Sequence, residues 1–475
     1  MLTRLEAHGF KNLLDFSVDL GPFNCLAGPN GVGKSNVFDA VRFLSLLTDH
    51  TIMEAALAVR GTDPETSNPL DLFWSDGRDR MNRLRLAAEM LVEPQVVDDF
   101  GRAARASSTY LRYEVSFGYE DPSRRGRPGR LELLSEDLRH FTREEAERRL
   151  RFPHDARKFR TNVVRIRRGS KQRFISTEEG NDGKTQILVH RNGSVGLPKA
   201  HAAAAPRTII ATSSTSETPT ILAARREMQQ WRLLALEPSA MRGADRFHSV
   251  PNVGTEGGHL PATLFRLVTE FEEAGGDPEQ LYARVTSRLA DLVPIQELRV
   301  AVDEARSLLT LEARESSGIT LSSRSLSDGT LRFLALSIMC EDPAFRGLIC
   351  MEEPENGIHP SKMEAMIRLL KDLPVDPFRA PGDDNPLRQV LVATHSPYFV
   401  QLQDGSDLLL ATEARVRGPF DRPASTLRCR PLTDTWREDE KVRSVGLGTI
   451  VDYLTAPPEA QLTLDPDAFP AYREA

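Results

Sequence analysis

Apolar residues recur along the chain in short continuous runs and at helical spacing, and this pattern predicts an α/β protein. Residues 23–27 (FNCLA) form a short apolar run, and apolar side chains follow at helical spacing over 35–47. Residues 347–351 and 389–394 are two further apolar runs, each of which predicts a strand. We therefore expect apolar strands near both ends of the chain, with a helix soon after the first of them.

The remaining pattern predicts a β-rich and helical middle. Residues 2–20 alternate as one or two strands around a turn at 9–12, and later strand signals suggest an antiparallel β lobe. These later signals lie at 83–92, 110–119 and 131–138. Helices are expected at 218–229, 261–274 and 278–292, and strands at 231–236, 297–302 and 308–313. No segment sustains the roughly three or four heptads that a coiled coil requires.

Residues 28–35 (GPNGVGKS) match G-x-x-x-x-G-K-[ST] at every fixed position, between the expected strand and helix. In such a loop the glycines let backbone N–H groups surround phosphate oxygens, the lysine reaches the β- and γ-phosphates, and the final hydroxyl ligates Mg²⁺. A strand, a glycine loop and a helix in this order place a helix N-terminus toward an anion. The stretch therefore predicts a nucleotide phosphate site that uses Lys34 and Ser35.

Composition narrows the classes of protein that remain. A chain of 475 residues is long enough for two or three domains, or for one large domain with an insertion. Its net charge of −7 excludes a molecule that is cationic as a whole, so nucleic-acid binding would need a local patch. Four dispersed cysteines without a C-x-x-C pair support neither zinc nor disulfides. Because the sequence shows neither a cationic-then-apolar leader nor an apolar run long enough to span a bilayer, we expect a cytoplasmic protein with no membrane partner.

One stretch differs in charge from the rest of the chain. Residues 143–173, from Arg143 to Arg173, contain twelve Lys or Arg and only four Asp or Glu. Interleaved apolar residues would turn the guanidinium groups outward on a strand, giving a surface that could follow a DNA backbone. The alternatives are a solvated face that binds nothing and a face that pairs with an acidic neighbour.

Three further stretches occur in a fixed order after the middle. They are 324–330 (RSLSDGT) before a helical run, 352–360 (EEPENGIHP) after an apolar strand, and 394–397 (THSP) after another. Each has an ordinary structural explanation: a helix N-cap, a solvated corner and a structural histidine. Their joint occurrence downstream of a phosphate loop favours a functional explanation.

These motifs, together with 10–12 (FKN) and 28–36, resemble ABC-type ATPases of the RecF/SMC/OLD branch, and within it OLD-like AAA-type proteins. The resemblance covers about the first 50 residues and 320–400, whereas the middle resembles the family only in layout. It implies an α/β P-loop ABC-type ATPase head built from both chain ends, with a β-rich and helical middle insertion. The expected parts are the first half of the head at 1–95, the lobe and insertion at 96–320, and the second half with a tail at 321–475.

The resemblance also implies ATP and Mg²⁺ as cofactors and gives the motifs their roles. Ser35 and Glu352 would act on the metal, Glu353 would orient the attacking water, and His395 would sense the γ-phosphate. The expected catalytic residues are Lys34, Glu353 and His395. The expected nucleotide-binding residues are Asn30, Gly31, Gly33, Lys34, Ser35, Asn36, Ser327 and Gly329. Because Ser327 and Gly329 would reach the ATP of another protomer, two complete sites require a homodimer or higher oligomer.

The sequence departs from the family pattern in several places. Asp328 stands where transporters commonly have a second glycine, and Glu352 replaces the commoner aspartate. No convincing Q-loop glutamine is present, and Gln229 and Gln230 are candidates by location only. The segment after His395 lacks the acidic cluster of a Toprim nuclease, so we expect an effector in trans.

These observations lead to one leading hypothesis and two rivals. We expect an ATP-hydrolysing switch, dimerised by ATP, that senses or handles DNA in bacterial antiviral defence or DNA repair and works with a nuclease or toxin effector. One rival is a scaffold that holds ATP, hydrolyses it slowly and keeps a toxin or nuclease partner inactive. The other is the ATPase subunit of a membrane transporter, which the Glu-Glu-Pro-Glu stretch and the long middle insertion make least favoured.

Overall fold

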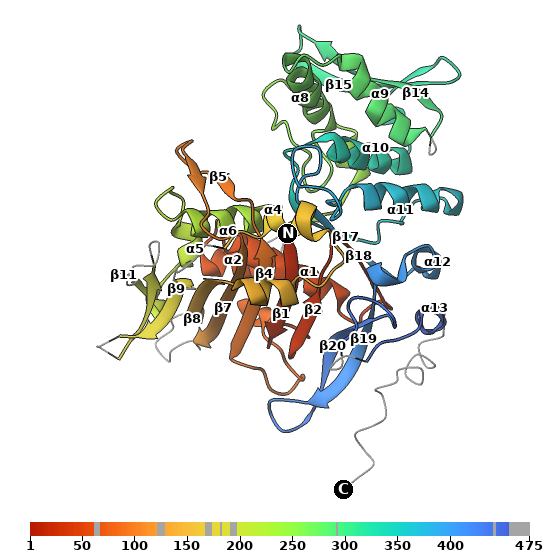
Figure 1. Ribbon diagram of the computed structural model, residues 1–475. Helices are drawn as coiled ribbons and strands as arrows, with labels where there is room; N and C mark the ends of the chain where they lie inside the picture. The colour runs from red at the N-terminus through yellow and green to blue at the C-terminus, as the bar shows by residue number, and fades with distance from the viewer. Residues whose placement is uncertain are drawn as a thin grey trace.

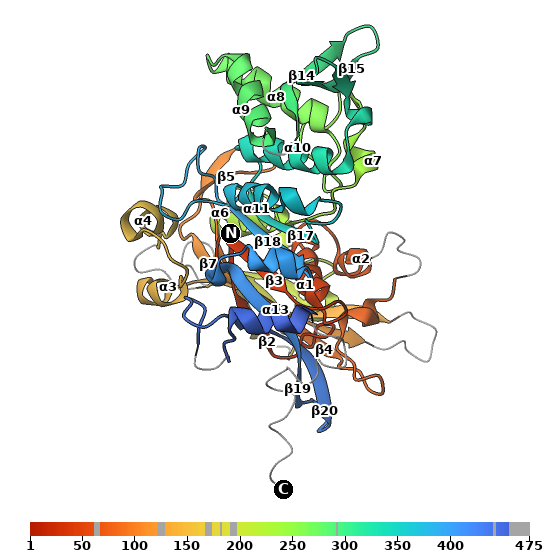
Figure 2. The same cartoon turned by 90° about the vertical axis from the view of Figure 1, so that its right-hand side faces the viewer.

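The computed structural model describes residues 1–60, 67–120, 129–166, 173–180, 183–190, 197–290, 293–439 and 443–455. Two large sheets form its centre, and a smaller lobe of helices and strands stands at the top of the view in Figure 1. Figure 2 shows the molecule from the right-hand side of the view in Figure 1.

The first sheet has six strands in the order β12-β17-β18-β3-β19-β20. These are β12 (Arg232–Leu234), β17 (Gly347–Glu352), β18 (Arg388–Thr394), β3 (Phe23–Ala27), β19 (Leu408–Arg417) and β20 (Pro423–Pro431). All neighbours are parallel except β19 and β20. Every residue of β3 and β18 is buried, as expected of parallel strands that are covered on both faces. The sheet joins both ends of the chain, and this confirms the expected fold class.

The second sheet is antiparallel, in the order β11-β10-β9-β8-β7-β4-β1-β2. Its strands are β1 (Leu2–His8), β2 (Phe16–Asp19), β4 (Arg83–Leu91), β7 (Tyr110–Glu120), β8 (Arg130–His140), β9 (Arg173–Glu179), β10 (Thr185–Val189) and β11 (Leu197–His201). The strands predicted at 83–92, 110–119 and 131–138 are confirmed as β4, β7 and β8. The boundary expected at residue 95, between the first half of the head and the middle lobe, falls within this sheet. Strands β1, β2 and β4 precede it, and β4 pairs with β7, which follows it.

Helix α1 (Lys34–Leu46) lies between the two sheets. Its apolar face belongs to one core with both, and Phe43 contacts Phe117 of β7 with ring centroids 5.6 Å apart. Helix α6 (Pro219–Gln229) joins the same core and leads into β12. The middle of the chain therefore contributes a helix to this core and an edge strand to the six-stranded sheet.

The opposite face of the six-stranded sheet packs against α10 (Asp328–Glu341) and α11 (Met363–Asp372). Above them lies the small lobe, which contains α8 (Leu260–Glu273), α9 (Pro278–Leu289), β13 (Asp245–Arg246), β14 (Ile295–Asp303), β15 (Leu308–Glu315) and β16 (Thr320–Ser322). The helices and strands predicted between 261 and 313 are confirmed.

Shorter elements connect these parts. They are α2 (Ile52–Ala58), η1 (Pro69–Leu72), β5 (Gln95–Val97), β6 (Ala103–Arg105), η3 (Ala202–Ala204), α5 (Ile209–Thr212), α7 (Pro238–Met241), η4 (Ser323–Ser325), η5 (Pro360–Lys362), α12 (Pro397–Gln401), η6 (Gly405–Asp407) and α13 (Leu447–Thr455). No helix in the described ranges combines the length and the apolar character needed to cross a bilayer.

The basic stretch is mainly helical where it was expected to be a strand, so that prediction is wrong. It forms α3 (Arg143–Arg149), the π-helical turn η2 (Ala156–Arg160) and α4 (Thr161–Val163), and of its described residues only Arg173 belongs to a strand. Thr142 and Glu145 close a capping box that begins α3, a local signal that the charge pattern concealed. Arg167, Arg168 and Lys171 lie outside the described residues.

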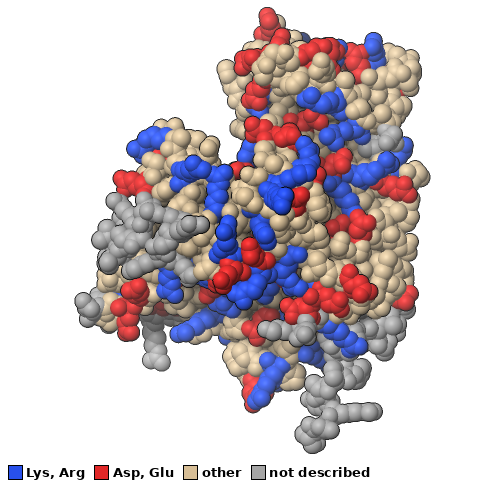
Figure 3. Space-filling model, viewed as in Figure 1, with Lys and Arg blue, Asp and Glu red and all other residues tan. Residues whose placement is uncertain are grey.

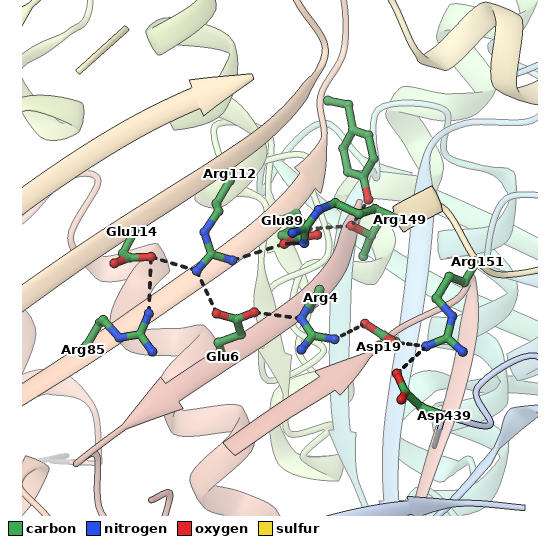
Figure 4. A network of polar contacts seen from close by, with 12 residues as sticks. Arg4, Glu6, Asp19, Arg85, Glu89, Arg112, Glu114, Arg149, Arg151 and Asp439 are labelled. Carbon is green, nitrogen blue, oxygen red and sulfur yellow. Dashed lines mark hydrogen bonds and ion pairs between the residues drawn. The ribbon is translucent and has the colours of Figure 1, made fainter. Parts of the chain in front are cut away.

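Several arginines of this stretch pair with acidic residues of the antiparallel sheet. Arg149 contacts Glu89, and Arg151 contacts Asp19 at 3.0 Å. In Figure 4 these pairs continue across the sheet through Arg112, which lies 2.7 Å from Glu6. Figure 3 shows the same mixture of positive and negative side chains on the middle of this face. The contacts favour the alternative in which basic side chains pair with acidic neighbours.

Candidate nucleotide-binding site

The motifs meet at one edge of the six-stranded sheet. Strands β17, β18 and β3 are parallel neighbours, and Ala27 is in register with Thr394 while Ala393 is in register with Glu352. The carboxyl ends of these strands therefore bring residues 28–35, the two glutamates and the His395 turn together. Ligands of open α/β sheets bind at this end of the strands.

The phosphate loop begins with a close backbone approach. Gly28 N–H donates to Thr394 O at 3.1 Å, and an added Cβ at Gly28 would lie 2.6 Å from Ala411 O. Gly31 and Gly33 have φ angles of 82° and 103°, in the left-handed region that favours glycine. Asn30 and Gly31 are exposed at the tip of the loop. The loop thus has glycine where the backbone must turn.

Asn12 supports the loop from outside it. Its Nδ2 donates to Val32 O at 2.9 Å, and its side chain fills the space that a Cβ at Gly33 would need. Asn36 Nδ2 donates to Asn12 Oδ1 at 2.7 Å, and Arg60 donates to Asn36 Oδ1 at 2.9 Å. Asn36 therefore supports the loop through Asn12. No sequence pattern indicates the contact of Arg60, which is 24 residues away from Asn36 in the chain.

Lys34 is folded back over the loop. Its Nζ donates to Gly28 O at 2.6 Å and to Pro29 O at 2.8 Å. Burial lowers the pKa of Lys34, while the nearby carboxylates of Glu353 and Glu352 act in the opposite direction. An ammonium group held by two neutral carbonyls gains electrostatic energy when it can contact a phosphate instead.

Glu353 and His395 contact each other directly. His395 Nδ1 lies 2.7 Å from Glu353 Oε1, and Asn356 Nδ2 donates to Glu353 Oε2 at 2.6 Å. Glu353 also has a φ angle of 46°, a left-handed conformation that is costly for a residue with a side chain. Its N–H donates to Ala393 O at 2.8 Å, which holds the strained backbone in place. No sequence motif indicates the contact between Asn356 and Glu353.

The signature residues lie at the start of α10. Ser327 Oγ accepts from Thr330 N at 3.2 Å, so Ser327 is the N-cap. Gly329 lies beside the turn that follows Glu353, where an added Cβ would be 3.5 Å from Gly357 O. Arg332 of α10 donates to Asn356 O on the same turn. These contacts place the motif next to the glutamate turn of its own chain.

Neither candidate for the Q-loop glutamine lies at the site, so that suggestion is wrong. Gln229 Nε2 donates to Asp49 Oδ1 at 2.7 Å, beyond the C-terminal end of α1. A helix rises about 1.5 Å per residue, which puts this contact roughly 20 Å from Lys34. Gln230 adjoins Gly347 at the first residue of β17, the end away from the glutamates.

The residues present fit a magnesium nucleotide. The Ser35 hydroxyl and the Glu352 carboxylate supply the oxygen donors that Mg²⁺ prefers, and this ion usually takes its other ligands from phosphate and water. Glu352 is exposed at the end of β17, and open space surrounds Gly31. Within the described ranges, no group of three or more His, Cys, Asp or Glu could hold a metal alone.

The parallel sheet, the phosphate loop on its central strand and the acidic turn beside it define a P-loop ATPase of the ABC type. Residues 23–401 match the family described as "AAA domain, putative AbiEii toxin, Type IV TA system". The match spans most of the chain, so the protein belongs to this family. It is an AAA-type ATPase domain, and its family membership implies nucleotide use.

Solved structures of SMC heads are similar at low identity. The SmcHead bound to the C-winged helix domain of ScpA has 14% identity and a TM-score of 0.48, over 91% of this chain and 98% of that one. The Smc head domain of Pyrococcus furiosus, with an extended coiled coil and bound to the C-terminal domain of ScpA, has 12% identity and a TM-score of 0.42, over 90% of this chain and 96% of that one. The SMC head domain from Thermotoga maritima has 12% identity and a TM-score of 0.35, over 91% of this chain and 98% of that one.

Proposed function

We propose that the protein binds and hydrolyses Mg²⁺-ATP at the edge of β3, β17 and β18, and that it belongs to the OLD-like group of such ATPases. The observation that carries the proposal is the contact between Glu353 and His395, which follow β17 and β18, at the same edge of the sheet as the phosphate loop that follows β3. Phosphoryl transfer depends mainly on positioning and electrostatic stabilisation, which is what such a constellation supplies.

Each residue has a defined task in this proposal. Lys34 leaves the carbonyls of Gly28 and Pro29 and binds the β- and γ-phosphates. Glu353 orients the attacking water, and His395 contacts the γ-phosphate while it holds Glu353. Mg²⁺, held by Ser35 and Glu352, would neutralise charge on the phosphates.

The signature suggests that the active unit is a pair of heads. Ser327 and Gly329 lie beside the glutamate turn of their own chain, and the proposal assigns them to the ATP of a second head. ATP then links two protomers, and hydrolysis releases them. A ligand that favours one of two states in this way makes the protein a switch.

In this proposal the switch senses or handles DNA in antiviral defence or DNA repair, and it acts with a nuclease or toxin effector in trans. Arg143, Arg148, Arg157 and Lys158 are exposed and lie within α3 and η2. They are the described part of the basic stretch that is best placed to contact phosphates. The contacts of Arg149 and Arg151 remove those two from this role.

A second function, the slow ATP-bound scaffold that keeps a toxin or nuclease inactive, has its own support. The ion pairs of Arg149 and Arg151 leave fewer cations for DNA than the sequence suggested. The family description also names a toxin system, which fits a protein partner better than a DNA substrate.

Steady-state ATP hydrolysis with and without duplex DNA tests these proposals. Wild type, Glu353→Gln and the control Glu364→Gln, an exposed carboxylate on α11, are compared side by side. The leading proposal predicts DNA-stimulated hydrolysis in wild type and control but not in Glu353→Gln. Slow hydrolysis at a rate that DNA does not change, together with a stable co-purifying protein, would instead support the scaffold.

A further inference from the structure

Thr394 and Glu355 form a buried contact next to the phosphate loop. Glu355 lies two residues after Glu353 and is 7% exposed, while Thr394 ends β18 and is fully buried. The Thr394 hydroxyl donates to Glu355 Oε1, and Glu355 Oε2 has no hydrogen-bond partner among the described residues. A buried polar atom without a partner is costly, and such groups are rare in native proteins. The proposed mechanism does not use Glu355, so this contact needs its own explanation.

Thr394 connects three parts of the site. Its carbonyl accepts from Gly28 N–H at 3.1 Å, at the start of the phosphate loop. Its hydroxyl accepts from Ser396 N–H at 2.9 Å, which closes the turn around His395. A hydroxyl has one proton to donate, and here that proton goes to Glu355. The orientation of the hydroxyl, and with it the closed turn, is therefore set by the glutamate.

The surroundings of Glu355 are charged but do not compete for this contact. Burial raises the pKa of Glu355, and the nearby Glu353 carboxylate acts in the same direction, while His395 opposes it. Lys34 is close enough for Glu355 to act on its pKa, yet Lys34 makes its hydrogen bonds to the loop carbonyls. Glu355 thus contacts the turn and not the groups assigned to the reaction.

We propose that Glu355 is a positioning residue for ATP hydrolysis. It holds the Thr394 hydroxyl so that the 394–396 turn presents His395 to Glu353 and to the γ-phosphate. This inference rests on the function proposed above and adds a residue to it. It differs from the role of Glu353, because Glu355 acts only through Thr394.

Two pairs of variants separate the contact from general stability. Glu355→Ala and Thr394→Val remove it, whereas Glu355→Gln keeps an oxygen acceptor and Thr394→Ser keeps the hydroxyl. Thr286→Val is a matched control, because the buried Thr286 hydroxyl donates to Tyr282 O at 2.8 Å in the small lobe. All variants are measured in the full chain for kcat and for KM with ATP.

The disruptive variants should lower kcat about tenfold, which corresponds to about 1.4 kcal/mol in the barrier, with an unchanged KM. Glu355→Gln and Thr394→Ser should restore kcat, and Thr286→Val should hydrolyse ATP like wild type. Wild-type kcat in Thr394→Val would overturn the inference. A Glu355→Gln variant as slow as Glu355→Ala would overturn it too, because the acceptor would then be irrelevant.

Hydrogen exchange gives a second readout that does not require hydrolysis. Peptides that cover 394–401 should exchange faster in Glu355→Ala and Thr394→Val, and like wild type in Glu355→Gln. Unchanged exchange in Glu355→Ala would overturn the inference even in a preparation that hydrolyses no ATP. By contrast, a wild-type protein that neither binds nor hydrolyses ATP would refute the proposed function alone.

Discussion

At the scale of single residues, the backbone and the side chain of Glu353 are both constrained by their contacts. Its backbone is left-handed, and both of its carboxylate oxygens are held, one by His395 and one by Asn356. Strain that persists at such a position is common at functional sites. The sequence predicted the residue from its motif but not the conformation, because φ depends on the Ala393 carbonyl of a neighbouring strand.

Glu353→Gln should bind ATP and hydrolyse it at least about a hundredfold more slowly, because a positioned acid–base group contributes about that factor or more. The amide keeps the size of the side chain but cannot act as the carboxylate does on water. Single-turnover hydrolysis and ATP binding, measured together, check the prediction. Wild-type turnover in this variant would contradict the role of Glu353.

Lys34→Ala should lose ATP affinity rather than turnover alone. Hydrogen bonds to charged groups are worth about 1.5–3 kcal/mol, so the dissociation constant should rise about tenfold or more. Lys184→Ala, which removes an exposed lysine just before β10, is the control. Titration with a fluorescent ATP analogue measures both, and equal affinities in the two variants would refute the assignment of Lys34.

At the scale of elements, the phosphate loop depends on Gly33 for two separate reasons. Its φ angle is 103°, and a side chain would collide with Asn12. Gly33→Ala should therefore lose ATP binding and also melt at a lower temperature. Gly101→Ala, with a φ angle of 77° and open space around it, should show only the strain of about 1–2 kcal/mol. Similar ATP binding in both variants would show that the Asn12 contact is unimportant.

Glu136 of β8 gives a prediction for pH. Its carboxylate accepts from Ile209 N at 2.6 Å and Ile210 N at 2.9 Å, and so ties α5 to the sheet. Burial raises the pKa of Glu136 to about 7, above its usual 4.5. The folded state then keeps a proton that the unfolded state loses, so this contribution to stability is present below pH 4.5 and is lost as the pH rises toward 7.

The comparison of wild type with Glu136→Gln isolates this effect, because both proteins share all other titrating groups. The stability of wild type relative to the variant should fall between pH 4.5 and 7, by no more than about 3 kcal/mol at about 1.4 kcal/mol per pKa unit. Thermal melts of both proteins at pH 5 and pH 8 measure it. A difference in melting temperature that does not change with pH would contradict the raised pKa.

The elements also show what the sequence could predict. Strands β3, β17 and β18 were predicted because parallel strands buried on both faces must be apolar. The basic stretch was predicted as a strand from its alternating charge, although the Thr142–Glu145 capping box indicated a helix there. The Arg60–Asn36–Asn12 chain could not be predicted, because no local pattern records contacts between distant residues.

At the scale of the whole molecule, the chain returns to one sheet from three places. Strand β3 comes from the first part, β12 from the middle, and β17 to β20 from the last part. The sequence predicted the contribution of both ends, since their motifs share one phosphate site. It predicted a strand at 231–236 but not its place in this sheet, because a periodic pattern over so few residues does not show which strand will be the neighbour.

If the DNA part of the proposal is correct, charge reversal at Arg157 and Lys158 should weaken binding to duplex DNA. The slope of log affinity against log salt should fall by about two, since each phosphate contact contributes about 0.9. Arg306→Glu, an exposed residue of the small lobe, is the control. An unchanged slope after the double reversal would remove these residues from any DNA surface.

If two heads complete each ATP site, specific ATPase activity should depend on protein concentration. Turnover per protomer should rise with concentration and then level off as heads pair, while turnover of Glu353→Gln should remain near zero throughout. Turnover per protomer that is constant from the most dilute sample upward would contradict a shared site unless the protein stays paired by an independent measure of its mass. Full activity in a demonstrated monomer would refute the claim.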